Sequence, residues 1–186
     1  MKTDRFDIRV TGYGGQGVIL CSYIIGKATA LFAEYHSTMT QSFGPEARGS
    51  ACSAQVVIDK NRVLFPYVKK QDLLIAMSQE GYMKFARDMN PGGVLVYDND
   101  MVHPGEELAA DVKKYGIPAS ALAVKVVGKA MTSNIVILGF FAATTDRIPR
   151  TAIEEAVKSS VPGGTEKMNL LAFETGYDYF KKNYSA

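Results

Sequence analysis

The sequence predicts an α/β fold of the Rossmann-like kind, in which a mostly parallel, mixed sheet forms the middle layer of a three-layer α/β/α arrangement. Three observations support this class. β-branched runs alternate with helical patterns along the chain. The first strand breaks into closely spaced glycines that open a helix, and a short polar turn predicts one antiparallel strand pair. The 186 residues, 47% of them hydrophobic, suit one domain over residues 1–186 with a sizeable core.

The expected strands are apolar or β-branched runs bounded by turn residues. Two of them, at 51–58 and 62–65, flank the tight turn Asp59-Lys60-Asn61 and should therefore be antiparallel neighbours. Asn90-Pro91-Gly92-Gly93 is typical of a turn that precedes a strand. The expected strands cover residues 6–11, 37–43, 51–58, 62–65, 72–77, 94–97 and, as a short last element, 116–118.

The expected helices follow from apolar residues three and four positions apart. Residues 119–129 are ambiguous, because their valines favour a strand while their alanines and Ser120 favour a helix, and we assign a helix. The last helix carries a stripe of large side chains, typical of a core or a subunit interface: Leu170, Phe173, Tyr177 and Phe180. The expected helices cover residues 18–33, 79–88, 106–115, 119–129, 134–145, 151–160 and 166–183.

Charge and cysteine content exclude several classes of protein. A net charge of +2 without a basic stripe does not indicate nucleic acid. Cys21 and Cys52 are the only cysteines, and an iron–sulfur cluster needs about four thiolates, so we expect neither a cluster nor a metal site on this chain. The longest strongly apolar run, residues 135–143, is far short of the ~20 residues that span a bilayer. With no leader pattern at its start, the chain is expected to be cytoplasmic, with reduced thiols.

The glycine-rich turn is the clearest local motif. Four glycines lie between Gly12 and Gly17, where the first strand should end and a helix should begin near Gln16 or Gly17. Such a turn lets a phosphate approach the main chain at a helix N-terminus. The dinucleotide fingerprint, however, also needs an acidic residue after a second strand, and the nearest acid is Glu34, at the end of the helix. A tight strand-to-helix turn without a ligand would give the same pattern.

No catalytic residue is assigned, since neither histidine has an evident Ser or Cys partner. Asp98-Asn99-Asp100 could hold a metal or a ribose beyond a strand, but an ordinary turn explains it and is favoured. Arg48 is the stronger candidate, because a guanidinium in a glycine-bearing loop after a strand is suited to anions, although a solvated surface arginine fits as well. Asn134 either caps its helix or contacts a ligand.

Four segments together carry a resemblance to a known family. They are Gly12-Tyr13-Gly14-Gly15-Gln16-Gly17, Gln41-Ser42-Phe43-Gly44-Pro45-Glu46-Ala47-Arg48-Gly49, Asn134 followed by Leu138-Gly139, and Asn169-Leu170-Leu171-Ala172-Phe173 before Gly176-Tyr177. With them the chain closely resembles, over almost its whole length, the gamma subunit of the 2-oxoacid:ferredoxin oxidoreductases. The family has a second glycine after Gly49, where this chain has Ser50. The second segment looks most like the 2-oxoglutarate type (2-oxoglutarate synthase), with the branched-chain 2-oxoacid and pyruvate types next.

The resemblance implies a fold of the pyruvate-ferredoxin oxidoreductase gamma-domain type and a place in a complex with alpha, beta and delta subunits that reduces ferredoxin. In this reaction a 2-oxoacid, here 2-oxoglutarate, and coenzyme A give an acyl-coenzyme A, here succinyl-coenzyme A, carbon dioxide and two reduced carriers. Thiamine diphosphate and magnesium would lie between the alpha and beta subunits and iron–sulfur clusters on cysteine-rich subunits. No cofactor would then be tightly bound to this chain.

For this chain the resemblance implies a set of binding residues that either hold the phosphate-bearing part of coenzyme A or brace the neighbouring catalytic subunit, and the sequence leaves both open. Two other classes remain: an independent nucleotide- or flavin-binding oxidoreductase, and a structural module whose glycines serve only the turn. Alone, the chain should be inactive and should self-associate through a surface near residues 41–50 or in its apolar C-terminal half. The binding residues are Gly12, Gly14, Gly15, Gln16, Gly17, Ser42, Gly44, Arg48 and Asn134.

Overall fold

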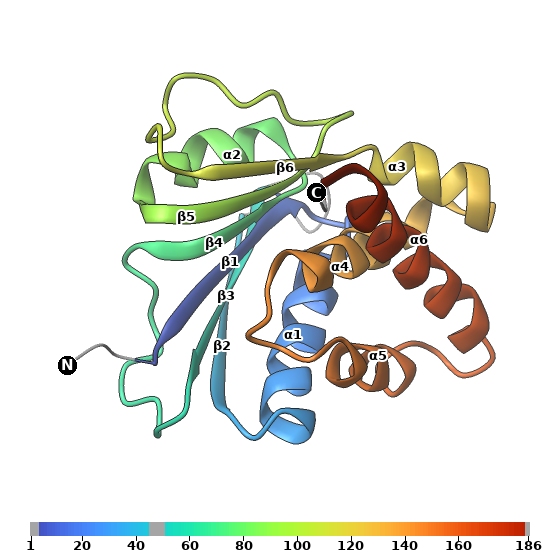
Figure 1. Cartoon of the computed structure of the whole chain (residues 1–186), viewed down its shortest axis with the longest axis horizontal. Coiled ribbons are helices and arrows are strands. Elements are labelled where there is room, and N and C mark those ends of the chain that lie inside the picture. The colour runs from blue at the N-terminus through green and yellow to red at the C-terminus, as the bar shows by residue number, and fades with distance from the viewer. Residues whose placement is uncertain (1–3, 45–50, 185–186) are drawn as a thin grey trace.

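The computed structural model describes residues 4–44 and 51–184, which form a six-stranded sheet and helices on both of its faces (Figure 1). The strands are β1 (Phe6–Tyr13), β2 (His36–Phe43), β3 (Ala51–Asp59), β4 (Gln71–Ala76), β5 (Met89–Asp98) and β6 (Lys113–Ile117). The α-helices are α1 (Val18–Phe32), α2 (Gln79–Phe85), α3 (Ala119–Leu122), α4 (Ser133–Thr144), α5 (Arg150–Lys158) and α6 (Glu166–Tyr184). Short 3₁₀ turns at Ala86–Asp88 and Ala130–Thr132 and a π-helical turn at Ala123–Val127 complete the helical segments.

The sheet has the strand order β2-β3-β1-β4-β5-β6, and its two halves differ in direction. β1, β4, β5 and β6 are parallel, whereas β3 runs antiparallel to both β1 and β2. Tyr13 at the end of β1 pairs with Ala51 at the start of β3, and Phe43 at the end of β2 pairs with Cys52. The prediction of a mostly parallel, mixed sheet is therefore confirmed. The last residues of β1 and β2 and the first residues of β3 lie together at one end of the strands, which we call the sheet edge.

The layers on the two faces are unequal (Figure 1). α1 and α4 lie over one face, with α5 packed on α1 and α6 packed on α4, while α2 lies on the other face. A large apolar cluster fills the first side, and a smaller one, which includes Leu74, Tyr82 and Leu95, fills the second side beside β4 and β5. The three-layer arrangement expected from the sequence is confirmed, with most of the core on the α1 side.

Close packing of α4 on α6 depends on two glycines. A Cβ atom at Gly139 would overlap the carbonyl oxygen of Phe173, and one at Gly176 would overlap the carbonyl oxygen of Val136. The predicted stripe on the last helix faces this contact, since Phe173 and Phe180 are buried and Leu170 and Tyr177 pack against the main cluster. The core interpretation of that stripe is therefore confirmed for Phe173 and Phe180.

The predicted strand at 62–65 is wrong. β3 is followed by a segment without regular structure, residues 60–70, which joins β3 to β4. We call it the β3–β4 strap. Both edges of β3 already pair, with β1 on one side and β2 on the other, so no edge remains to which a hairpin partner could bind.

The predicted helix at 106–115 is also wrong. Leu108 and Val112 are buried in the smaller apolar cluster, and Lys113–Ile117 forms β6, so the short last strand is real and starts earlier than expected. The turn residues 90–93 lie inside β5, at a register shift against β4. In both places, pairing with a neighbouring strand overrides the local helix and turn signals.

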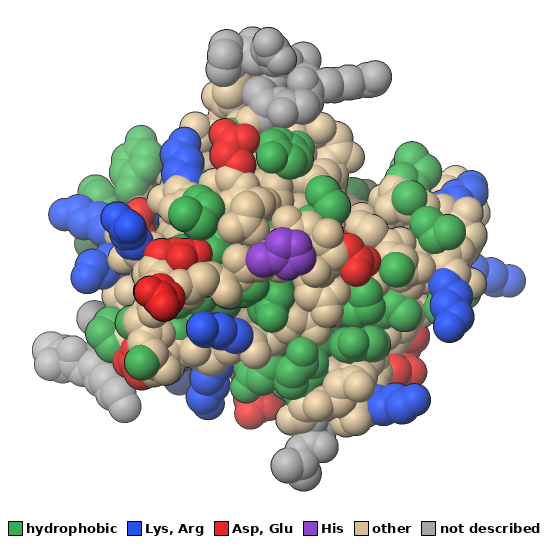
Figure 2. Space-filling model, turned by 90° about the horizontal axis from the view of Figure 1, so that it is seen from above, with side chains coloured by type: hydrophobic (Ala, Val, Ile, Leu, Met, Phe, Trp, Pro, Cys, Tyr) green, Lys and Arg blue, Asp and Glu red, His purple; other side chains and the backbone are tan. Residues whose placement is uncertain are grey.

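No helix in the described part of the chain is long and apolar enough to cross a membrane. On the face of the molecule seen from above, acidic, basic and apolar side chains are interspersed (Figure 2). Charge is thus not segregated by sign on that face.

Replacing Gly139 by alanine should destabilise the fold strongly, because its new methyl group would meet backbone atoms of α6 rather than a movable side chain. We expect a loss of about 3 kcal/mol in the free energy of unfolding, the upper end of the usual cost of overpacking. Gly163→Ala is the matched control, since a Cβ atom there meets nothing within 4 Å. Urea denaturation of both variants measures the difference, and equal stabilities would contradict the role given to the α4–α6 contact.

Candidate functional site

The glycine loop between β1 and α1 requires glycine at two positions. Gly15 has a φ of 99° and Gly17, the residue before the first turn of α1, has a φ of 76°. Side-chain residues rarely adopt this left-handed region. α1 begins at Val18, where the helix expected at 18–33 starts and one or two residues after the start expected from the glycine turn, and its first N–H groups follow the glycine loop at the end of β1.

Both polar atoms of the half-buried Gln16 side chain bond the backbone of the protein. Its Oε1 accepts a hydrogen bond from the backbone N–H of Tyr13 at 2.6 Å, and its Nε2 donates to the carbonyl oxygen of Met77 at 3.0 Å. Gly12 leaves room for this, because a Cβ atom there would lie 2.6 Å from the same Oε1. Gln16 therefore ties the glycine loop to the end of β4 and positions it.

Asn134 lies against the last glycine of the loop. It is the second residue of α4, is 4% exposed, and its side-chain amide occupies the space that a Cβ atom at Gly17 would need. The structure thus brings together the glycine loop and Asn134, which the sequence could only name separately.

Ser42 and Gly44 lie at the same sheet edge, on the face that α2 covers. With Thr11 and Ser53 they line a small cavity of about 80 Å³ beside α2. The backbone N–H of Gly44 donates to the carbonyl oxygen of Ala51 at 2.9 Å. Arg48 lies outside the described residues, so its place relative to this cavity stays a prediction. β1 and β2 point the same way, and β3 lies between them.

Lys84 of α2 is the charged residue among the described residues that line this cavity. Thr11 Oγ1 donates to the carbonyl oxygen of Cys52 at 3.2 Å, and burial raises the pKa of the Cys52 thiol, which keeps it neutral. One cation among hydroxyl groups suits a small anionic group such as a phosphate or a carboxylate. The cavity is far smaller than the sites that hold whole cofactors.

Sequence reasoning missed Lys84, Thr11 and the close approach of α2. A Cβ atom at Gly81 would overlap Thr11 Oγ1, so α2 rests directly on β1. A signal for this was available. Ser78 follows the expected strand at 72–77, and its Oγ accepts the backbone N–H of Gly81, which marks a second strand-to-helix turn at the same sheet edge.

The other chemical candidates lie apart from this edge group or serve the fold. Asp98 accepts hydrogen bonds from Ser120 Oγ at 2.9 Å and from the backbone N–H of Asp100 at 3.2 Å, as the turn interpretation requires. Cys21 is fully buried in α1, and burial raises its pKa to about 12. Within the described ranges, no three His, Cys, Asp or Glu side chains are grouped to hold a metal ion.

Gln16→Ala should destabilise the protein by about 1–3 kcal/mol, since it leaves the Tyr13 N–H and the Met77 carbonyl without partners in a half-buried turn. Gln79→Ala is the control, because Gln79 makes the equivalent pair of hydrogen bonds to the backbone of His103 at an exposed site. Chemical denaturation should separate the two variants. Equal, small losses of stability in the two variants would show that the hydrogen bonds of Gln16 do not position the loop.

Asp98→Asn should flatten the dependence of stability on pH. Burial raises the pKa of the folded-state carboxyl, so its contribution to stability is greatest below the unfolded-state pKa and is lost as pH rises through the raised value. Asparagine keeps the shape and cannot ionise. Ser120→Ala should do the opposite and steepen the fall, because the Ser120 hydrogen bond holds that pKa down. Urea midpoints between about pH 4 and 7 test this, and three parallel pH profiles would contradict it.

Comparisons with known proteins agree with this geometry. A family profile described as "Pyruvate ferredoxin/flavodoxin oxidoreductase" matches residues 7–179. The 2-oxoglutarate synthase subunit KorC of Methanocaldococcus jannaschii is 41% identical over 178 residues, which are 96% of this chain and 95% of the relative.

Two solved structures share the fold. The gamma subunit of a keto/oxoacid ferredoxin oxidoreductase from Geobacter sulfurreducens has a TM-score of 0.83 at 33% identity, covering 94% of this chain and 95% of its own. The 2-oxoglutarate:ferredoxin oxidoreductase of Magnetococcus marinus, solved with 2-oxoglutarate, coenzyme A and succinyl-CoA bound, has a TM-score of 0.87 at 24% identity. That match covers all of this chain and 32% of the Magnetococcus chain, and it supports the fold alone.

Proposed function

The chain belongs to the pyruvate ferredoxin/flavodoxin oxidoreductase family, and on this premise we propose that it is the gamma-type subunit of a 2-oxoacid:ferredoxin oxidoreductase that acts on 2-oxoglutarate. The observation that carries the proposal is the 41% identity with a 2-oxoglutarate synthase subunit over nearly the full length of both chains. Branched-chain 2-oxoacids and pyruvate are the alternative substrates. The chain, residues 1–186, would act as one domain in the cytoplasm.

The proposed reaction breaks the bond between the carboxylate and the keto carbon of 2-oxoglutarate and forms the thioester of succinyl-coenzyme A. One carbon dioxide and one proton leave, and the two electrons reduce two ferredoxins. Thiamine diphosphate, Mg²⁺ and iron–sulfur clusters supply the decarboxylation and electron transfer. This chain does not fit a cluster, because its two cysteines lie in different elements and both are buried. Alpha, beta and delta subunits would hold these groups.

The part of this chain would be to contact coenzyme A at the sheet edge. The glycine loop turns the N-terminus of α1 toward that edge, and helix N-termini favour phosphate groups. Lys84 adds a cation on the α2 side. The proposed contacts are Gly12, Gly14, Gly15, Gly17, Ser42, Gly44, Arg48 and Asn134, with Gln16 holding the loop in place. In the alternative, the same edge braces a catalytic subunit.

Purified alone, the chain should be colourless and inactive. A visible absorbance spectrum and an assay of viologen reduction that depends on 2-oxoglutarate and coenzyme A test this. The same assay should report activity once the chain is assembled with its alpha, beta and delta subunits. Turnover by the isolated chain would instead favour the independent oxidoreductase.

Arg48→Ala and Lys84→Ala should each raise the Michaelis constant for coenzyme A in the assembled enzyme by about 10- to 150-fold, the effect of losing a charge-assisted hydrogen bond of about 1.5–3 kcal/mol. Arg87→Ala, one helical turn beyond Lys84 and exposed, is the control. Weaker assembly with an unchanged Michaelis constant for coenzyme A would support the bracing role instead.

A further inference from the structure

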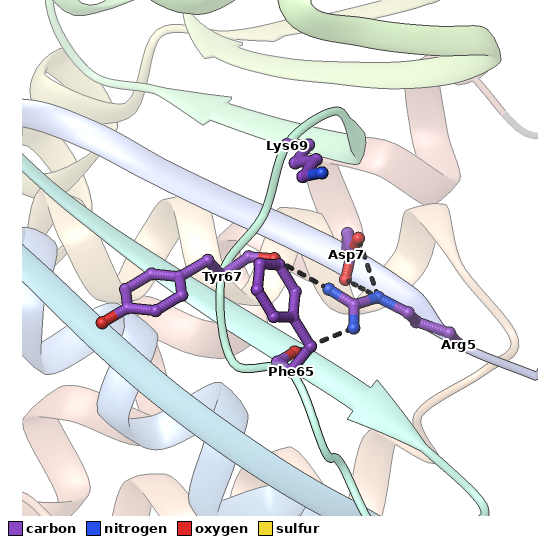
Figure 3. A pocket seen from close by; sticks show the side chains of 5 residues that line it. All are labelled: Arg5, Asp7, Phe65, Tyr67 and Lys69. Carbon is purple, nitrogen blue, oxygen red and sulfur yellow. Dashed lines mark hydrogen bonds and ion pairs between the residues drawn. The ribbon is translucent and has the colours of Figure 1, made fainter.

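The β3–β4 strap presents large apolar side chains to solvent. Leu64 is 86% exposed, Phe65 47% and Tyr67 57%. The Phe65 and Tyr67 rings meet edge to face with their centroids 5.6 Å apart (Figure 3). Clustered exposed side chains of this size in a soluble protein mark a binding surface more often than isolated ones do.

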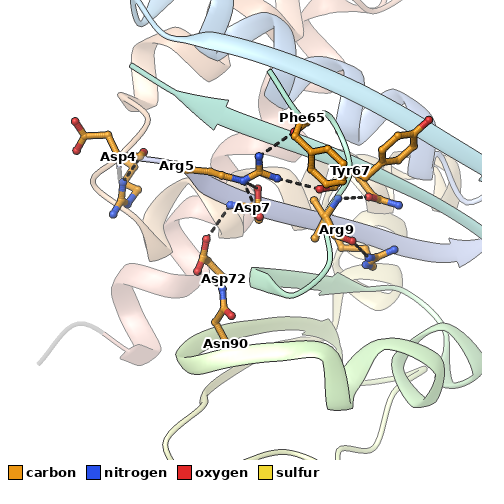
Figure 4. A network of polar contacts seen from close by, with 11 residues as sticks. Asp4, Arg5, Asp7, Arg9, Phe65, Tyr67, Asp72 and Asn90 are labelled. Carbon is orange, nitrogen blue, oxygen red and sulfur yellow. Dashed lines mark hydrogen bonds and ion pairs between the residues drawn. The ribbon is translucent and has the colours of Figure 1, made fainter. Parts of the chain in front are cut away.

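The strap is pinned to the sheet although it has no strand partner. Arg5 is the residue before β1. It donates from Nη1 to the carbonyl oxygen of Phe65 at 2.8 Å and from Nη2 to that of Tyr67 at 2.9 Å (Figure 3). Its Nε donates to the carboxylate of Asp7 at 2.9 Å. Arg9 Nη2 donates to the carbonyl oxygen of Val68 at 3.0 Å (Figure 4). The pinning contacts therefore come from under the strap and leave its outer side chains free.

Arg9 is buried beneath the strap and helps to fix its conformation. It is 6% exposed, its guanidinium lies 4.2 Å from the centre of the Phe85 ring, and burial lowers its pKa. A buried cation is costly unless its donors are used, and here they hold Gln71 and the Val68 carbonyl. On the other side, the backbone N–H of Val68 donates to Gln55 Oε1 at 2.7 Å. A loop held in this way loses little conformational entropy when it binds.

The positive charge of the strap indicates which kind of molecule it binds. Lys60, Arg62, Lys69 and Lys70 are basic, and residues 60–70 include no acidic side chain. A second copy of this chain docked strap to strap would bring like charges together, which disfavours it. The net charge of the whole chain, only +2, does not indicate a nucleic acid as the occupant, although Phe65 and Tyr67 expose rings. The surface fits a protein whose acidic rim surrounds an apolar pocket.

We propose that the β3–β4 strap is a preformed docking surface for another subunit of the same oxidoreductase. The matching patch on that subunit has an apolar centre and an acidic rim. The identity of the partner rests on the proposed function. Leu64 and Tyr67 are the anchors, the four basic residues steer association, and Arg5 is a positioning residue that keeps the anchors in place.

The test measures binding of the full purified chain to the purified remaining subunits of the complex. Leu64→Asp and Tyr67→Ala should each raise the dissociation constant by about 30-fold, the effect of losing an interface hot spot. Arg5→Gln should weaken binding while leaving the outer surface unchanged in composition. Met131→Asp, at a position 79% exposed outside the strap, is the matched control and should bind normally. Thermal unfolding of each isolated variant verifies that it is folded, and raised salt should slow wild-type association.

The outcomes separate the two proposals. If the wild-type chain does not bind the remaining subunits, the proposed function and the named partner both fall. If the wild type assembles and folded Leu64→Asp and Tyr67→Ala bind equally well, the strap inference alone is overturned. It is also overturned if Leu64→Asp abolishes a wild-type homodimer in equilibrium sedimentation, or abolishes tight binding of a single-stranded oligonucleotide.

Discussion

The different pairing on the two sides of β1 is the constraint on which the rest of the structure depends. β3 binds β1 antiparallel on one side and β4 binds it parallel on the other. Since β3 starts where β1 and β2 end, the glycine loop, Gly44 and Ala51 are brought to one sheet edge. β3 then finishes at the opposite edge, where β4 begins beyond β1. The chain must therefore cross β1, and the β3–β4 strap is that crossing.

The two faces of β1 differ in polarity, and the strap crosses the polar one. Ile8 and Val10 point into the main apolar cluster, while Arg9 and Thr11 point to the α2 face. On that face β2 contributes Thr38 and Thr40, whose buried hydroxyl groups have no hydrogen-bond partner among the described residues. The seven-residue α2 packs on β1, β3 and β4 and covers only part of this polar surface. The remainder binds the strap and forms the small cavity near Ser42.

The family assignment and this geometry point to the same division of labour. Both thiols of the chain are buried, and its described part groups no three metal-ligating side chains. What it offers is a rigid edge, set by Gln16 and the glycine loop, and a pinned basic strap on one face. Both features suit a subunit that binds and positions other groups, one of them the proposed ligand and the other a neighbouring chain.

The sequence by itself determined the elements whose signals are local. The strand before Gly12, the helix after Gly17 and the apolar helix at 134–145 were predictable, because glycine conformation and hydrophobic period act within a few residues. Only the tertiary structure decided which strand edges were free. That is why 62–65 became a strap and 106–115 became a loop and a strand, why Gln16 turned inward to Met77, and why Lys84 lies beside Ser42. Such contacts depend on which distant segments the sheet order brings together, and a local pattern carries no record of that order.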